Sequence, residues 1–167
     1  MKNFFNRALQ LLLFALPLIA GQIGQMLFGI GDVMVAGHYS QEAVAAIGIA
    51  SGILGPFMMV GLGFTFAISA LTARERGAKN DVSTILGPAI LLSLIIGLIF
   101  SILIVIVAYQ LERLNLAGNL APLARNYLII CAPSIIPALL FQCLKEYLQA
   151  HEQTWFANAC ILFFNLI

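Results

Sequence analysis

The chain has 167 residues, of which 62% are hydrophobic and only 9% are charged, and its mean hydropathy is +1.02. Soluble domains carry about 25% charged residues, so this composition excludes a soluble domain. It predicts an all-α integral membrane protein that is embedded in the lipid bilayer. The formal net charge of +1 gives no indication of a nucleic-acid partner.

Long uncharged stretches follow one another along the chain. A spanning helix needs about 20 mostly apolar residues, and most of these stretches reach that length. We therefore predict about five transmembrane helices, at residues 8–37, 43–73, 82–111, 126–149 and 153–167. The fifth stretch is shorter than a full crossing and ends with the sequence.

The segments between the predicted spans carry most of the charged residues. The second helix is expected to end in a charged loop, Arg74–Asp81, with Gly77 as its cap. Residues 112–125 have a mixed composition that suits a short interfacial helix. Polar residues from Lys145 to Glu152 are expected to form a turn before the fifth helix, with Glu146 and Glu152 in contact with water.

Basic residues are distributed unevenly between the two ends of the predicted helices. Lys and Arg in short loops favour the cytoplasmic side of a membrane. With five helices, one side would hold the basic residues at positions 2, 7, 74, 76, 79 and 145, and the other only Arg113 and Arg125. The sequence therefore predicts a multi-pass protein with a cytoplasmic N-terminus, and it places Asp32 toward the outer end of the first helix.

Asp32 is the most informative residue because no other charged residue lies between positions 8 and 41. A carboxylate in a spanning helix is costly and marks a functional site by default. Gln22, Gln25, Gly29 and Asp32 recur at helical spacing and predict a polar face directed at the bundle interior. Asp32 would either take up a proton, since burial favours a neutral carboxyl, or bind a hard cation such as Na⁺. A structural alternative is that it only hydrogen-bonds to a neighbouring helix.

Few other residues at membrane depth suggest chemistry. Gln142 is interpreted as an interhelical hydrogen-bonding residue, and the cysteines at 131, 143 and 160 as small hydrophobic residues. The sequence contains no nucleophile–base set, phosphate-binding loop or metal-ligand cluster. We therefore predict no enzyme activity, no catalytic residue, no cofactor, and no metal site beyond a possible Na⁺ at Asp32.

Glycine and proline residues interrupt the predicted helices. Gly48 and Gly52 form a small-residue pair that would allow close helix packing. Pro17, Pro88 and Pro133 lie within or at the ends of spans, where each removes a backbone donor and can kink its helix. Such irregular backbone must be buried in protein or line a cavity, which favours a moving, cavity-bearing bundle.

Several motifs along the sequence resemble those of the multidrug and toxic compound extrusion (MATE) transporters, and most closely those of their bacterial NorM-like branch. The first helix is similar in its run Leu16–Ala20 and in its run Gly31–His38. The second helix is similar at Glu42–Ile47. The most specific similarity lies in the last third, which contains Tyr127-Leu128, Ala132-Pro133, Pro137–Gln142, Tyr147–Ala150 and finally Asn165.

This resemblance implies a fold and a mechanism. Residues 1–167 would form a partial N-terminal transmembrane lobe that corresponds to most of one six-helix MATE lobe. The protein would lie in a bacterial inner membrane. Such proteins exchange H⁺ or Na⁺ for drugs and organic cations. By motif, Asp32, Asn165 and Tyr127 would belong to the cation site, and Pro17 would be a bend point. The remaining partner would be the missing C-terminal lobe of the same protein.

The sequence departs from the family by ending within the predicted fifth helix, so we expect an N-terminal fragment. Two other hypotheses stay open. One is a lipid-linked oligosaccharide flippase of the same superfamily. Such flippases tend to carry more basic residues in their central cavity, whereas the first three predicted spans contain no Lys or Arg. The other is a non-transporting membrane subunit that packs through the Gly48–Gly52 face.

Overall fold

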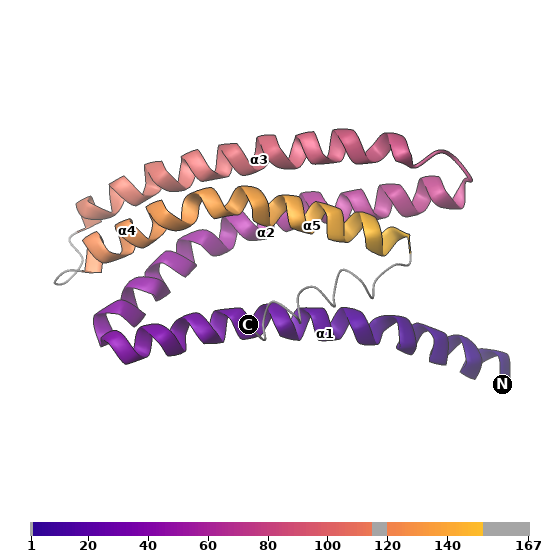
Figure 1. Cartoon of the computed structure of the whole chain (residues 1–167), viewed down its shortest axis with the longest axis horizontal. Coiled ribbons are helices and arrows are strands. Elements are labelled where there is room, and N and C mark those ends of the chain that lie inside the picture. The colour runs from indigo at the N-terminus through magenta and orange to yellow at the C-terminus, as the bar shows by residue number, and fades with distance from the viewer. Residues whose placement is uncertain (1, 115–119, 152–167) are drawn as a thin grey trace.

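The computed structural model describes residues 2–114 and 120–151, and all regular secondary structure in these ranges is helical (Figure 1). Three long helices come first: α1 (Lys2–Tyr39), α2 (Gln41–Gly77) and α3 (Ser83–Gln110). A short 3-10 helix, η1 (Leu111–Leu114), follows α3. Then α4 (Leu120–Cys131), the 3-10 segment η2 (Ala132–Ser134) and α5 (Ile135–Ala150) form one continuous rod.

Four helical stretches are long and apolar enough to cross a membrane, namely Ile19–Tyr39, Gln41–Gly77, Ser83–Gln110 and Leu120–Ala150. The prediction of an all-α protein is therefore confirmed, and so are the first four spans in number and order. The predicted fifth span, at 153–167, lies outside the described residues. With 37 residues, α2 would be about 55 Å long. It exceeds the hydrocarbon core of about 30 Å and must tilt or project beyond it.

The end of α2 lies further along the chain than the predicted residue 73. Arg74, Glu75 and Arg76 extend the helix to Gly77 instead of forming a loop, and Ala78 rather than Gly77 is the cap. The chain then reverses at Lys79, whose φ of 59° lies in the left-handed region. Its N–H donates to the Arg76 carbonyl at 3.0 Å, which satisfies one of the last carbonyls of α2.

The fourth span also differs from its predicted bounds. It begins at Leu120 rather than at 126, whereas its end at Ala150 lies one residue beyond the predicted 149. Lys145–Ala150 are therefore helical, although these polar residues were also expected to form a turn. The regular helix is interrupted at η2, because Pro133 has no N–H to donate. Beside it, the Ser134 hydroxyl donates to the Cys131 carbonyl at 2.6 Å.

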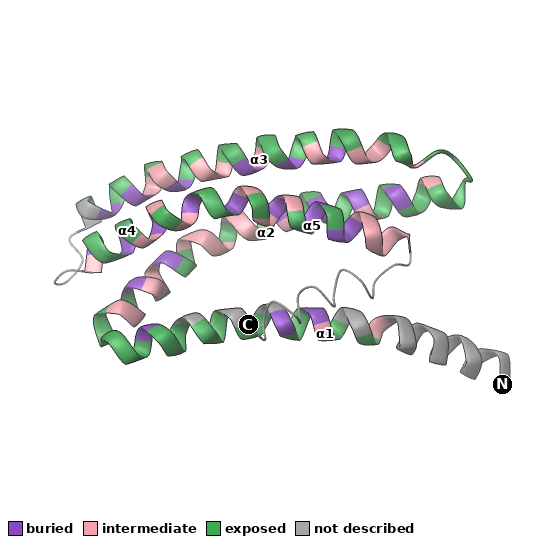
Figure 2. Ribbon diagram, viewed as in Figure 1, coloured by how far each residue is buried: buried purple, intermediate pink, exposed green. Residues whose placement is uncertain are grey.

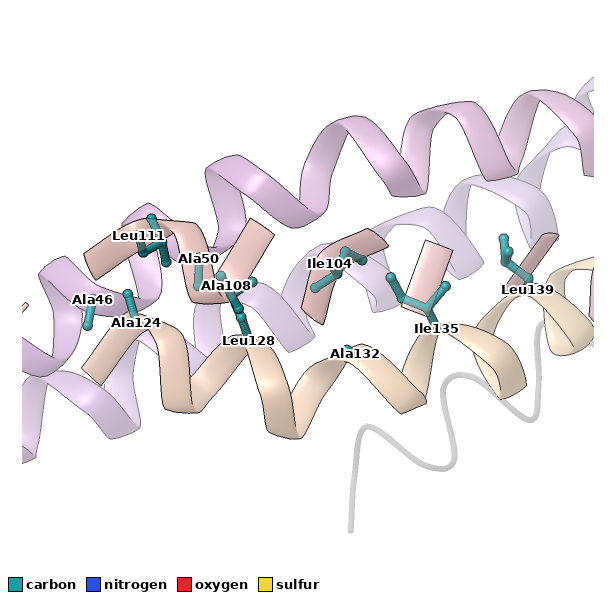
Figure 3. Packing of buried hydrophobic residues seen from close by; sticks show 10 residues of the cluster. All are labelled: Ala46, Ala50, Ile104, Ala108, Leu111, Ala124, Leu128, Ala132, Ile135 and Leu139. Atoms are coloured by element: carbon teal, nitrogen blue, oxygen red, sulfur yellow. The ribbon is translucent and has the colours of Figure 1, made fainter. Parts of the chain in front are cut away.

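The core of the bundle lies where α2, α3 and the α4–α5 rod meet. In Figure 1, α3 runs antiparallel to α2, whereas the rod runs in the same direction as α2. Figure 3 shows the buried cluster, whose alanines allow the helices to approach closely. Its members are Ala46, Ala50, Ile104, Ala108, Leu111, Ala124, Leu128, Ala132, Ile135 and Leu139. Phe57 and Phe100 extend it with an edge-to-face contact at 5.5 Å between ring centroids.

Two glycines mark the closest approaches between helices, and they are not the predicted pair. A Cβ added at Gly61 would lie 2.5 Å from Leu139 Cδ2, and one at Gly97 would lie 3.0 Å from Ile136 Cα. A Cβ at Gly48 or Gly52 would meet no atom within 4 Å. No other described helix therefore packs closely against Gly48 and Gly52, and the predicted close packing at this pair stays a prediction.

A turn at Ser40 joins α1 to α2, and from there α1 diverges from the rest of the bundle (Figure 1). The Ser40 hydroxyl accepts from the Ala43 N–H at 3.0 Å, and this cap fixes the start of α2. Large apolar side chains on α1 and on the outer faces of the bundle are exposed, among them Met26, Met59 and Ile130 (Figure 2). Such a surface suits contact with lipid.

Candidate functional site

The residues predicted for the cation site begin on α1. Asp32 belongs to this helix, close to its end at Tyr39. It is four residues before Ala36, a spacing that puts both positions on one face of the helix. Ala36 is buried. The side chains of Asp32, Gln25 and Pro17 lie outside the described part of the structure, so their predicted roles stay predictions.

The polar face predicted for α1 is described only in part. Gln22 and Gly29 are exposed, whereas Gly21 and Gly24 are buried along with Ala36. The structure thus describes both exposed and buried positions on α1, and the predicted polar face stays a prediction.

A pocket of about 360 Å³ lies where α1, α2 and α4 converge. Val35, Ala36 and Tyr39 line it from α1, and Ala43, Ile47 and Tyr127 line it from α2 and α4. Tyr127 is half-buried and packs against the core cluster. The structure thus brings Tyr127 to the segment of α1 that begins one turn after Asp32. Asn165, the third predicted member, lies outside the described residues.

The pocket has a chemistry that follows from its lining. Its walls are mostly apolar, with the two tyrosine side chains as aromatic groups that also carry a hydroxyl. Aromatic faces attract organic cations through their quadrupole, and pockets of about 300–1,000 Å³ hold small molecules. Residues 2–114 and 120–151 contain no group of three or more His, Cys, Asp or Glu that could hold a metal ion.

Sequence reasoning missed a second group of polar residues, near the other end of the bundle. Gln142, Lys145 and Glu146 on α5 are all buried, with 5%, 3% and 4% of their surfaces exposed. The prediction that Glu146 is solvated is wrong, because α5 continues and its side faces α2. Leu139, Cys143 and Glu146 share the spacing of one buried helix face, and that periodicity is the signal that could have revealed it.

The prediction for Gln142 also requires correction. Its side-chain amide donates to the Glu146 carboxylate at 2.9 Å, so this bond lies within α5 rather than between helices. The contact between helices comes instead from Ser69 of α2, whose hydroxyl lies near the same carboxylate. Closer to the helix ends, the Arg76 guanidinium donates to the Ala150 carbonyl at 2.9 Å and joins α2 to α5 again.

Comparison with solved structures defines the class of protein. The arrangement of helices matches a structure described as an outward-facing conformation of a multidrug resistance MATE family transporter of the MOP superfamily. The TM-score is 0.83 at 19% identity, covering 91% of this chain and 34% of that one. A MOP superfamily transporter from Pyrococcus furiosus gives a TM-score of 0.81 at 18% identity. The chain is therefore a helical membrane protein with the fold of one part of such a transporter.

Sequence comparison identifies the family. The MatE family model matches residues 17–167, so the chain belongs to the MATE family, a family of transporters and not of enzymes. It is 31% identical over 160 residues to a probable multidrug resistance protein NorM from Synechococcus sp.. It is 26% identical over 156 residues to the multidrug resistance protein NorM of Photobacterium profundum. The chain spans 34% of the length of each of these relatives.

Proposed function

We propose that this chain is the N-terminal part of a cation-coupled antiporter that exports drugs and organic cations by alternating access. The coupling ion would be H⁺ or Na⁺. Membership of the MATE family supports this function. The structural observation that best supports this function is the pocket lined both by Tyr127 and by the segment of α1 that begins one turn after Asp32. A carboxylate on a helix that lines a pocket with aromatic groups suits both an inorganic cation and an organic one.

The setting we propose is a bacterial inner membrane, with the N-terminus in the cytoplasm. Three features lie toward the same end of the bundle: the start of α1, the α2–α3 turn and the end of α5 (Figure 1). Arg74, Arg76 and Lys79 are near this end, which supports its assignment to the cytoplasmic side. The described helices would form most of one lobe, with the fifth span and a second lobe of the same protein completing the cavity.

In the proposed mechanism Asp32 exchanges its cation as the lobe changes conformation, Tyr127 and Asn165 complete the cation site, and Pro17 provides the bend in α1. A cation shifts such an equilibrium only by its difference in affinity for the two conformations. Coupling free energies of this kind are typically about 1–3 kcal/mol. Occupation of Asp32 by a cation would therefore shift the lobe toward the conformation with lower drug affinity and lower the apparent affinity for drug by roughly 5–150-fold.

The test uses the complete transporter that contains this segment, in energised inverted membrane vesicles. Asp32→Asn removes the charge with little change in shape, and we expect it to abolish cation-driven accumulation of ethidium while the protein level in the membrane stays unchanged. Glu42→Gln is the control, because Glu42 is an exposed carboxylate at the start of α2. Ethidium transport by Asp32→Asn equal to that of the wild type would refute the proposal.

A further inference from the structure

A buried polar cluster lies between α2 and α5, away from the pocket at Tyr127. We define it as Ser69 and Thr72 of α2 with Gln142, Lys145 and Glu146 of α5. It lies about one turn before the end of α5 at Ala150, toward the end of the bundle that holds the α2–α3 turn (Figure 1). Asp32 is toward the opposite end of the bundle, near the α1–α2 turn. Ionisable residues within spans are rare and mark functional sites by default.

Two neutral side chains stabilise the Glu146 carboxylate among the described residues. Gln142 Nε2 donates at 2.9 Å, and the Ser69 hydroxyl of α2 lies close enough to the carboxylate to stabilise its charged form. Lys145 attracts the carboxylate electrostatically without being one of these donors. Adjacent residues on a helix point about 100° apart, so Lys145 and Glu146 do not face each other directly. The negative charge of Glu146 is thus held by neutral donors, with a cation only at longer range.

Thr72 provides an independent observation at the same interface. Its side chain is 0% exposed, and its hydroxyl oxygen has no hydrogen-bond partner in the part of the chain that the structure describes. Thr72 is flanked by two contacts between α2 and α5: Ser69 with Glu146 one turn before it, and Arg76 with Ala150 one turn after it. A buried hydroxyl without a partner is unfavourable, so the interface between α2 and α5 has an unused hydrogen-bonding position one turn from Ser69.

The charged groups around Glu146 are few. From α5 they are Lys145 and, beyond it, His151, whose ring Nδ1 is 3.0 Å from the Tyr147 carbonyl. From α2 the nearest is Arg76, which donates to the Ala150 carbonyl. The helix α3 contains no charged residue and contributes Ala89 to the contact with Cys143. No described group forms an ion pair with the carboxylate within hydrogen-bonding distance, and Lys145 is the cation that attracts it. A proton on Glu146 removes the buried negative charge and leaves Lys145 as the buried positive charge.

We propose that Glu146, which accepts from Gln142 and faces the helix that carries Ser69 and Thr72, is a proton-binding site near the inner membrane surface, separate from the cation site proposed at Asp32. A proton from the inner aqueous phase adds to one carboxylate oxygen, and Lys145 remains as the cation of the cluster. The neutral acid then becomes a hydrogen-bond donor, and the unused Thr72 position allows the donors to change partners. Binding and release of this proton alter the contact between α2 and α5.

Infrared difference spectroscopy tests this site directly, because the C=O stretch of a protonated carboxyl group is resolved from that of a carboxylate. The chain is reconstituted in lipid bilayers and titrated from about pH 9 to about pH 5, above the range where exposed carboxyl groups take up protons. In the Asp32→Asn background, which removes the other carboxyl group proposed to bind a proton, we expect a titrating carboxyl signal that is lost in Glu146→Gln and retained in Glu42→Gln. The same signal in Glu146→Gln, or none in the wild type, would overturn the proposal.

A second variant keeps the test decisive if Glu146→Gln does not insert as a helical protein. Ser69→Ala removes one donor to the charged form, and we expect the midpoint of the Glu146 signal to move to higher pH by about one to two units. Ser51→Ala, at an exposed position of the same helix, should leave the midpoint unchanged. An unchanged midpoint in Ser69→Ala would overturn the proposal. Asp32→Asn should leave the signal intact, so failure of the transport proposal is distinguished from failure of this one.

Discussion

The close approach of α3 and α5 at Gly97 predicts how a single methyl group would change stability. In Gly97→Ala the new Cβ would lie 3.0 Å from Ile136 Cα and 3.4 Å from its Cγ1. Carbon atoms prefer separations of about 3.5–4.0 Å, so the two helices would have to move apart by roughly 0.5 Å. The atom that must move first belongs to the backbone of α5, which a change of rotamer cannot relieve.

The magnitude follows from two opposing effects. Inserting a methyl group into a packed contact costs about 1–3 kcal/mol, whereas replacing glycine by alanine within a helix contributes about 0.8–1.0 kcal/mol of stability. Gly87→Ala is the matched control on the same helix, because a Cβ there would meet no atom within 4 Å. We therefore expect Gly97→Ala to be less stable than Gly87→Ala by about 1–3 kcal/mol.

The assay is unfolding of each variant by a denaturing detergent in mixed micelles, followed by far-ultraviolet circular dichroism. Because both substitutions change glycine to alanine in α3, their difference cancels the contribution of helix propensity and isolates the contact with Ile136. Equal unfolding free energies for the two variants would refute the packing of α3 against the start of α5.

Three further predictions concern the α2 cap, the start of α3 and the pocket. Ser40→Ala removes the cap on the Ala43 N–H and should destabilise the chain by about 0.5–2 kcal/mol in the same assay, whereas Ser51→Ala should not. The Ser83 side chain and N–H hydrogen-bond to Asp81 and hold the pKa of its carboxyl below the usual value. This interaction therefore stabilises the folded chain near neutral pH, and the stabilisation is lost as the pH falls below about 4. Asp81→Asn should remove this pH dependence when unfolding is measured at acidic and at neutral pH. Tyr127→Ala should raise the transport KM for an organic cation by about 2–30-fold at unchanged protein level, because it removes a cation–π contact of about 0.5–2 kcal/mol. An unchanged KM would count against binding of the organic cation in this pocket.

The sequence predicted the spans because the hydrocarbon core imposes one simple requirement. A spanning segment must be apolar over its whole length, so uncharged runs locate helices directly. The bounds were less accurate where charged residues continue a helix, as Arg74 and Arg76 do at the end of α2. A charge ends an apolar run in the sequence, but it does not end a backbone helix whose hydrogen bonds continue.

The buried cluster at Glu146 could not be predicted from the local pattern alone. Lys145 and Glu146 read as a solvated turn because their burial depends on α2, which lies far away in the sequence. The contact with Ser69 exists only because α2 and the α4–α5 rod run side by side in the same direction. Close glycine contacts have the same origin: Gly48 and Gly97 are alike in sequence, and only the neighbouring helix decides that Gly97 is the close contact.

The central claim is that this segment belongs to a transporter in which an ion gradient drives drug movement. The complete transporter in proteoliposomes, loaded with ethidium and given either an H⁺ gradient or a Na⁺ gradient, tests it most directly. The account predicts that one of these gradients moves ethidium against its own concentration difference, and that Asp32→Asn abolishes this movement. Ethidium movement that is the same with and without both gradients would contradict it.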